Sequence, residues 1–240
     1  LNLDRTRGLN LPRIFILVPD LVLLSLEGCD LDISDVIIQI QKLTKLRSIN
    51  LSGNRCTNSA KLRTPLPDNV LSVYVNNVTW EKQCLVEFFK YRVMKLSISY
   101  ISTTTDEWER LFDSLPENQN NTLASIIWDG NNLHSNFFNY LKNQICMNYL
   151  SLNDCFSQSH PECLSYLIDY LRYKDLALTE FSLRGTETNH IGEYLPNILN
   201  TIFNSTKITT IDVYGQRGGD QSLLTIKENI GNVNDPLHSD

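Results

Sequence analysis

Residues 123–133 read LASIIWDGNNL, and the same spacing recurs in LVLLSLEGCDL at 21–31 and in LRSINLSGNRC at 46–56. Each copy has apolar residues at its first, fourth, sixth and eleventh positions and an Asn or Cys at its ninth. The fourth and sixth residues point to the same face of an extended strand, whereas the residue between them points to the other face. The pattern therefore predicts a short strand with one buried face, closed by a turn.

Looser copies in the same frame extend this pattern along the chain, and a truncated copy opens it at Leu1 and Leu3. Successive fourth positions are separated by 25, 24, 23, 30, 24, 31 and 30 residues, a range typical of leucine-rich repeats. The fourth-position residues are Leu24, Ile49, Val73, Leu96, Ile126, Leu150, Phe181 and Ile211. We predict one domain of about eight to nine repeats over residues 1–231, followed by a polar tail at 232–240.

Amphipathic stretches with apolar residues at helical spacing lie between the later copies. A strand and a helix in each repeat predict an α/β solenoid, a horseshoe with a parallel concave sheet and helices on the convex side. The early repeats leave room for a short helix only, whereas those after Thr103 allow about three turns. We therefore expect the convex side to thicken along the chain, which we interpret as a segment of a longer protein.

The ninth position of the copy predicts a second regular feature, a ladder of buried amides. Asn54 and Asn131 can bond the backbone of the next turn, and Cys29 and Cys155 can replace them as compact buried groups. The corresponding residues in three other repeats carry no amide, so we expect the ladder to be irregular there. Those residues are Val78, Ile101 and Thr186.

Composition excludes several classes of function. The net charge is −6 and the basic residues are scattered, so nucleic acid is not an expected partner. No apolar run approaches the roughly 18 residues of a membrane-spanning helix, so membrane insertion is not expected. The six cysteines form no CxxC pair and no Cys–His cluster, which predicts free thiols, no metal site and a reducing, cytoplasmic location. Nothing in the sequence calls for a cofactor.

Three stretches resemble the central repeats of CARMIL-type proteins, within the ribonuclease-inhibitor-like subclass of leucine-rich repeats. They are LASIIWDGNNL at 123–133, LTEFSLRGTET at 178–188 and ITTIDVYGQRGGD at 208–220. CARMIL-type proteins are large cytoplasmic scaffolds that regulate actin capping protein and membrane-linked actin assembly, so the resemblance implies a scaffold in actin regulation. The capping-protein-binding tail of that family is not in this segment, so that activity does not transfer to it.

The strand positions that alternate with the apolar ones predict a binding surface for another protein. The predicted outward residues are Ser25, Glu27, Asn50, Ser52, Tyr74, Asn76, Ser97, Ser99, Ile127, Asp129, Ser151, Asn153, Ser182, Arg184, Asp212 and Tyr214. Exposed aromatic and Arg side chains dominate binding hot spots. We therefore expect a non-enzymatic scaffold whose partner-binding residues are Glu27, Tyr74, Asn76, Ile127, Asp129, Asn153, Arg184 and Tyr214.

Two other functions remain open at this point. One is a GTPase activator built on leucine-rich repeats, with Arg184 or Asn153 near the nucleotide. The other is an innate-immune or pathogen recognition module. A homodimer through an end of the solenoid is a further hypothesis.

No residue stands out as catalytic. Trp80, Trp108 and Trp128 occupy core positions and predict packing, and the glycines around Arg217 predict a turn, not a phosphate loop. A catalytic histidine needs an oriented partner at close spacing, and none has one, so we interpret all four as loop residues. They are His134, His160, His190 and His238.

Overall fold

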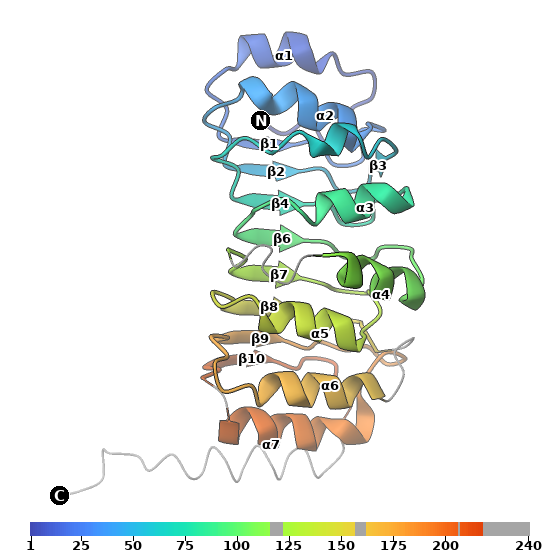
Figure 1. Cartoon of the computed structure of the whole chain (residues 1–240), viewed down its shortest axis with the longest axis vertical. Helices are drawn as coiled ribbons and strands as arrows, with labels where there is room; N and C mark the ends of the chain where they lie inside the picture. The colour runs from blue at the N-terminus through green and yellow to red at the C-terminus, as the bar shows by residue number, and fades with distance from the viewer. Residues whose placement is uncertain (116–121, 157–161, 206, 218–240) are drawn as a thin grey trace, which may run out of the picture.

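A computed structural model describes residues 1–115, 122–156, 162–205 and 207–217, and in it eight short parallel strands form one sheet in the order in which they occur along the chain. Figure 1 shows these strands one below the other along the long axis of the molecule. They are β1 (Leu23–Ser25), β2 (Ser48–Asn50), β4 (Ser72–Tyr74), β6 (Lys95–Ser97), β7 (Ser125–Ile127), β8 (Tyr149–Ser151), β9 (Glu180–Ser182) and β10 (Thr210–Asp212). A second, two-stranded parallel sheet pairs β3 (Arg55–Cys56) with β5 (Thr79–Trp80).

The predicted repeat frame is confirmed by the strand register. Each fourth-position residue is the middle residue of its strand and pairs with the fourth-position residue of the next repeat, from Leu24↔Ile49 to Phe181↔Ile211. The truncated copy at the start of the chain also pairs in parallel, through a bridge between Asn2 and Ser25. The spacing of apolar residues alone thus located every strand of the main sheet.

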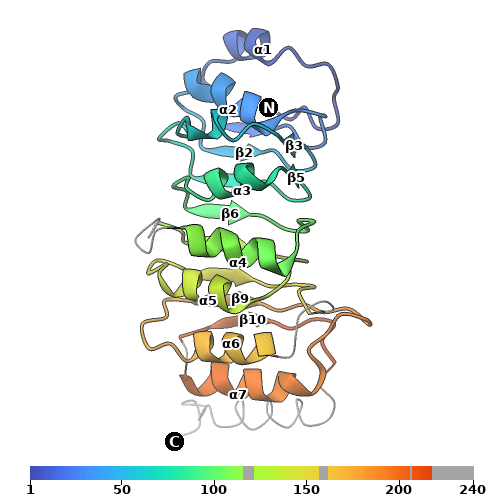
Figure 2. The ribbon, with the colours of Figure 1, turned by 45° about the vertical axis from the view of Figure 1, so that its right-hand side comes forward.

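The helices lie behind the sheet and lengthen along the chain, as predicted (Figures 1 and 2). α2 and α3 have seven residues each, whereas α4, α5, α6 and α7 have 10, 8, 10 and 11. The helices are α1 (Leu11–Leu17), α2 (Ile33–Gln39), α3 (Lys82–Phe88), α4 (Thr105–Ser114), α5 (Ser135–Lys142), α6 (Glu162–Leu171) and α7 (Leu195–Ser205), with 3-10 turns η1 (Ile40–Lys42), η2 (Lys61–Arg63) and η3 (Gly192–Tyr194). The helices spread over a longer stretch of the long axis than the strands do, so the stack curves and the sheet lies on its inner, concave side (Figure 1).

The first helix, α1, was not predicted, because its apolar residues run on toward β1 without a clear helical period. Its start is nevertheless encoded locally: the side chain of Asn10 accepts a hydrogen bond from the amide of Arg13, and Pro12 lies in the first turn. Leu11 and Phe15 of this helix are buried, so α1 covers one end of the core.

A continuous hydrophobic core fills the space between the sheet and the helices. Its largest fully buried side chains include Trp108 and Trp128, whose rings lie 4.5 Å apart, and Phe137, which stacks on Trp128 at 4.3 Å. The prediction that these two tryptophans serve packing is confirmed. Trp80 is half-buried and contacts Phe88 at a ring distance of 4.9 Å.

The predicted amide ladder is present and runs further than expected. Asn54 donates to the carbonyl of Leu26 and accepts from the amide of Leu31, so one side chain joins two repeats. In the repeat where Thr186 occupies the ninth position, Asn189 takes this role three residues later. In the described part of the chain, four side-chain amides form such a pair of hydrogen bonds, namely Asn54, Asn131, Asn189 and Gln216. Cys29 and Cys155 are buried, as predicted, and their thiols also donate to backbone carbonyls.

The fold is therefore a leucine-rich-repeat solenoid. The predicted domain boundary at residue 231 and the polar tail at 232–240 lie outside the described residues.

Candidate functional site

The side chains that alternate with the buried strand residues form one surface, which we call the open face of the sheet. It consists of the first and third residue of each main strand and the residue two positions after the third. All eight predicted partner-binding residues belong to this surface, because each occupies one of these positions. The open face is thus the candidate site, and its local geometry shows what each residue contributes.

A repeated hydrogen-bond motif, which we call the clamp, holds neighbouring repeats together on the open face. In each clamp, a side-chain oxygen of one repeat accepts from a Ser hydroxyl of the next repeat at 2.6–2.8 Å and from a backbone amide two residues later at 2.6–3.0 Å. The clamps join Asp4 to Ser25 and Glu27, Asn76 to Ser97 and Ser99, Asp129 to Ser151 and Asn153, and Asn153 to Ser182 and Arg184. Asn76, Asn153 and Asp129 therefore stabilise the solenoid itself.

The clamps also correct the prediction for several serines of the open face. Five of them lie at outward positions yet are buried. Their short side chains lie below the longer clamp residues, which form hydrogen bonds with these serines or with the backbone next to them. They are Ser52, Ser97, Ser99, Ser151 and Ser182. A partner that approaches this face meets the longer side chains and not these hydroxyls.

One group of predicted residues surrounds a shallow pocket of about 180 Å³ at the end of β1, β2 and β4. Glu27, Tyr74 and Asn76 line it together with Asn50, whose Nδ2 donates to Oε2 of Glu27 at 3.1 Å. Lys95 of the next strand places its Nζ 5.4 Å from the centre of the Tyr74 ring, a cation–π arrangement. The pocket thus combines a carboxylate, an aromatic ring and amide groups.

A second group lies toward the other end of the sheet. Nε of Arg184 forms an ion pair with Oδ2 of Asp212 at 2.6 Å, and Oδ1 of Asp212 accepts from the amide of Tyr214 at 3.1 Å. Tyr214 is 79% exposed, the highest value among the large hydrophobic side chains of the described chain. Ile127 is half-buried in β7, between the two groups. The predicted residues therefore form two clusters and not one site.

The open face is acidic. In the described part of the chain it carries the carboxylates of Glu27, Asp129, Glu180 and Asp212, against the cations Lys95 and Arg184. Both cations are engaged, Arg184 with Asp212 and Lys95 over the Tyr74 ring. A cationic group of a partner would therefore meet uncompensated negative charge.

Two carboxylates of this face have shifted pKa values. Burial raises the pKa of Asp129 above its ordinary range, and this effect outweighs the hydrogen bonds from Ser151 and Asn153 that lower it. At Asp212 burial also raises the pKa, but the bonds from Tyr214 and Arg184 outweigh it and hold the value below its ordinary range. Asp212 is thus the more firmly ionised of the two.

The roles of several residues were missed from the sequence. Asp4 and Lys95 contribute a clamp and a cation–π contact, and no repeat consensus marks them because both lie at variable positions. A recurring Ser at the third strand position, followed two residues later by a polar residue, is the sequence signal that could have revealed the clamps. It recurs at Ser25, Ser97, Ser151 and Ser182.

His134 departs from the prediction of a loop histidine. It lies just before α5 but is buried, and its Nδ1 accepts from the amide of Phe137, so it is the N-cap of that helix. Burial lowers the pKa of His134 to about 4, which keeps the imidazole neutral and able to accept this bond. His160, His238 and the predicted turn residues Gly218 and Gly219 lie outside the described residues.

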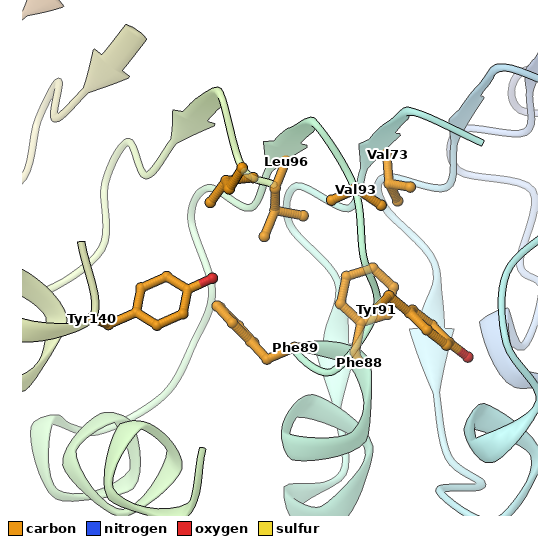
Figure 3. Close-up of a pocket in the computed structure, with 8 residues that line it drawn as sticks. Val73, Phe88, Phe89, Tyr91, Val93, Leu96 and Tyr140 are labelled. Atoms are coloured by element: carbon orange, nitrogen blue, oxygen red, sulfur yellow. The ribbon is translucent and has the colours of Figure 1, made fainter. Parts of the chain in front are cut away.

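The interior offers no room for a ligand at the cavity in Figure 3. There Phe89 and Tyr140 approach each other below Leu96, with a ring distance of 6.1 Å. The remaining space is about 10 Å³, which is at most the room for a single water molecule. Within the described ranges, no three His, Cys, Asp or Glu side chains are grouped as metal ligands would be. The longest described helix has 11 residues, and none there is long and apolar enough to cross a membrane.

Comparison with known proteins gives one kind of similarity. No family model matches the chain, and no curated protein matches it. Among solved structures, 39 chains match, including the internalin InlF of Listeria monocytogenes. The match has a TM-score of 0.45 and 11% sequence identity, and covers 85% of this chain. The chain spans 64% of the length of that internalin.

Proposed function

We propose that this chain is a non-enzymatic scaffold that binds another protein through the open face of its sheet, and that the partner presents basic side chains to it. The observation that carries the proposal is the pocket of about 180 Å³ lined by Glu27, Tyr74 and Asn76. A Lys or Arg side chain that enters this pocket meets a carboxylate and lies beside a Tyr ring, two groups that bind cations well.

The charge of the whole face supports a basic partner. Four carboxylates against two engaged cations attract a positively charged surface and disfavour a negatively charged one. Tyr74, Arg184 and Tyr214 add the aromatic and guanidinium groups that dominate binding hot spots. The clamps fix the backbone beneath them, so little conformational freedom is lost when a partner binds.

In its most specific form the proposal includes a role in actin regulation, which rests on the resemblance to CARMIL-type repeats. It also includes a cytoplasmic location, which rests on that resemblance and on the free cysteines. The GTPase-activator alternative places Arg184 or Asn153 near a nucleotide. Arg184 would first have to leave Asp212, 2.6 Å away, and Oδ1 of Asn153 already accepts from Ser182 and from the amide of Arg184. An innate-immune or pathogen recognition module would use the same open face, so the identity of the captured partner separates it from an actin regulator.

A homodimer through one end is a second candidate association, favoured by α1. Ile16 and Leu17 of this helix are 78% and 75% exposed at the end of the stack, where a second copy could cover them. Molecular mass in dilute solution tests this idea, because a strictly monomeric chain contradicts it. An Ile16→Asp variant should be monomeric if the wild type is a dimer.

Affinity capture from cell extract tests the main proposal. The wild-type chain is compared with a Glu27→Gln/Tyr74→Ala variant and with a control, Glu109→Gln/Tyr166→Ala, which makes the same changes at exposed helix positions. A partner retained by the wild type and the control but lost by the open-face variant supports the proposal. Its retention should also fall with added salt, since the attraction is electrostatic. Retention of the same proteins by both variants would show that another surface binds.

A further inference from the structure

A groove opens on the helical side of the solenoid where short repeats give way to long ones. The step from Val73 to Leu96 is 23 residues, whereas the step from Leu96 to Ile126 is 30. The neighbouring helices differ accordingly, with seven residues in α3 and 10 in α4 (Figure 1). Between them lies a cavity of about 380 Å³, whose described lining includes no residue of the open face.

The described lining of this groove combines an apolar interior with hydrogen-bond donors. Trp80, Val86, Ile101 and Leu111 contribute apolar surface, and Gln83 and Arg110 contribute polar groups. A volume of this size lies in the range of small-molecule sites, which are mostly apolar with a few placed polar groups.

The donors of the groove lack acceptors in the described part of the chain. Nε1 of Trp80 is buried and has no hydrogen-bond partner there. The exposed side chains of Gln83 and Arg110 form no hydrogen bond or ion pair within the same described ranges. Gln83 and Arg110 are therefore the donors that a ligand in the groove can reach, whereas Nε1 of Trp80 is covered by the protein.

The acid of the groove does not form an ion pair with Arg110 in the described part of the chain. Glu107 is the one carboxylate in the described lining, and it is used by the helix start: it accepts from Oγ1 of Thr103 at 2.7 Å and from the amide of Thr104 at 3.2 Å. Its position is fixed by this capping box at the N-terminus of α4. The guanidinium of Arg110 is therefore left to pair with a group from outside the protein.

We propose that the groove between α3 and α4 binds a small organic carboxylate with an apolar body, its carboxylate held by Arg110 and Gln83 and its body against Trp80. This site is independent of the open face, so it neither supports nor requires the proposed protein binding. Arg110 presents a planar donor pair that matches a carboxylate, which a neutral amide does not reproduce.

Nuclear magnetic resonance of the ¹⁵N-labelled chain tests the proposal with two probes, 4-phenylbutyrate and its uncharged amide. The indole N–H peak of Trp80, assigned with a Trp80→Phe variant, should move on addition of the carboxylate. The peak of Trp128 should stay in place, because its Nε1 already donates to the carbonyl of Asn132 at 3.2 Å. We expect the carboxylate to bind about ten-fold more tightly than the amide.

An Arg110→Gln variant should remove this preference, whereas Arg172→Gln, which changes an exposed Arg after α6, should leave it unchanged. Unchanged peaks of Trp108 and Trp128 verify that each variant is folded. The proposal is overturned if neither probe moves the Trp80 peak, if both bind equally, or if the preference survives in Arg110→Gln.

Discussion

Tyr100 lies directly over Gly130: a β-carbon at position 130 would come within 2.2 Å of Cδ1 of the Tyr100 ring. The Tyr100 hydroxyl then reaches Oδ2 of Asp154, 3.2 Å away in the following repeat. Tyr100 has a φ of +56°, a conformation that a bulky residue adopts only when its surroundings hold it there. One side chain thus joins three consecutive turns at the edge of the open face.

This relationship predicts that Gly130→Ala is costly. Gly130 has a φ of +68°, so an Ala side chain is strained and also displaces the Tyr100 ring. We expect the free energy of unfolding to fall by about 2–3 kcal/mol in urea denaturation.

A matched control separates the two effects. Gly8 has the same φ of +68°, but a β-carbon there meets nothing within 4 Å, so Gly8→Ala should cost only the backbone strain, about 1 kcal/mol. In a Tyr100→Gly background, Gly130→Ala should cost no more than Gly8→Ala. A full cost in that background would show that the Tyr100 contact is irrelevant.

Asn189 should matter more for stability than Thr186, although Thr186 holds the consensus position. Asn189→Ala removes two bonds between repeats, to the carbonyl of Asp154 at 2.6 Å and from the amide of Phe156 at 2.8 Å. We expect a loss of about 2 kcal/mol, because backbone groups that are partly buried lose their partner. Thr186→Ala removes one bond, from the exposed amide of Asn189, and should cost less than about 1 kcal/mol. If both variants lose the same stability in thermal unfolding, Asn189 does not take the ladder position of Thr186.

The clamp predicts that Asp129 supports the fold whether or not it binds a partner. Asp129→Ala leaves the buried Ser151 hydroxyl and the amide of Asn153 without their acceptor, so we expect a loss of about 2 kcal/mol in the free energy of unfolding. Asp212→Ala breaks the more exposed pair with Arg184, and surface ion pairs contribute about 0–1 kcal/mol. If chemical denaturation ranks the two variants the other way round, the clamp is not what stabilises this face.

His134 should make the stability of the chain depend on pH. Its pKa is about 4 in the folded chain against 6.5 for the free side chain, so the unfolded chain binds a proton that the folded chain does not. Stability contributed by the neutral imidazole is therefore complete above pH 6.5 and is lost as pH falls toward 4, by at most about 1.4 kcal/mol per pH unit.

A His134→Asn variant keeps a capping oxygen and cannot titrate in this range. Between pH 6.5 and 4 its melting temperature should fall less steeply than that of the wild type. Parallel curves would show that the buried imidazole does not contribute to the acid sensitivity.

The repeat frame was predictable because each strand has only three residues, and one apolar residue in the middle of each points into the core. Leu24, Ile126 and Ile211 could be placed without any tertiary information, since the period-two alternation and the even spacing leave one register that buries them all. The clamps could not be placed in this way. Asp129 and Ser151 are 22 residues apart, and their contact depends on the parallel register that brings the two repeats together.

Periodic burial and local capping specify the solenoid, its sheet order, the longer helices of the later repeats and two amides of the ladder, Asn54 and Asn131. Which outward residues are accessible depends instead on tertiary packing. A small side chain such as Ser97 is buried when a longer neighbour like Asn76 bonds across it. The groove beside Arg110 likewise exists only because a short helix packs against a longer one. Accessibility is a property of neighbouring repeats, and no single repeat encodes it.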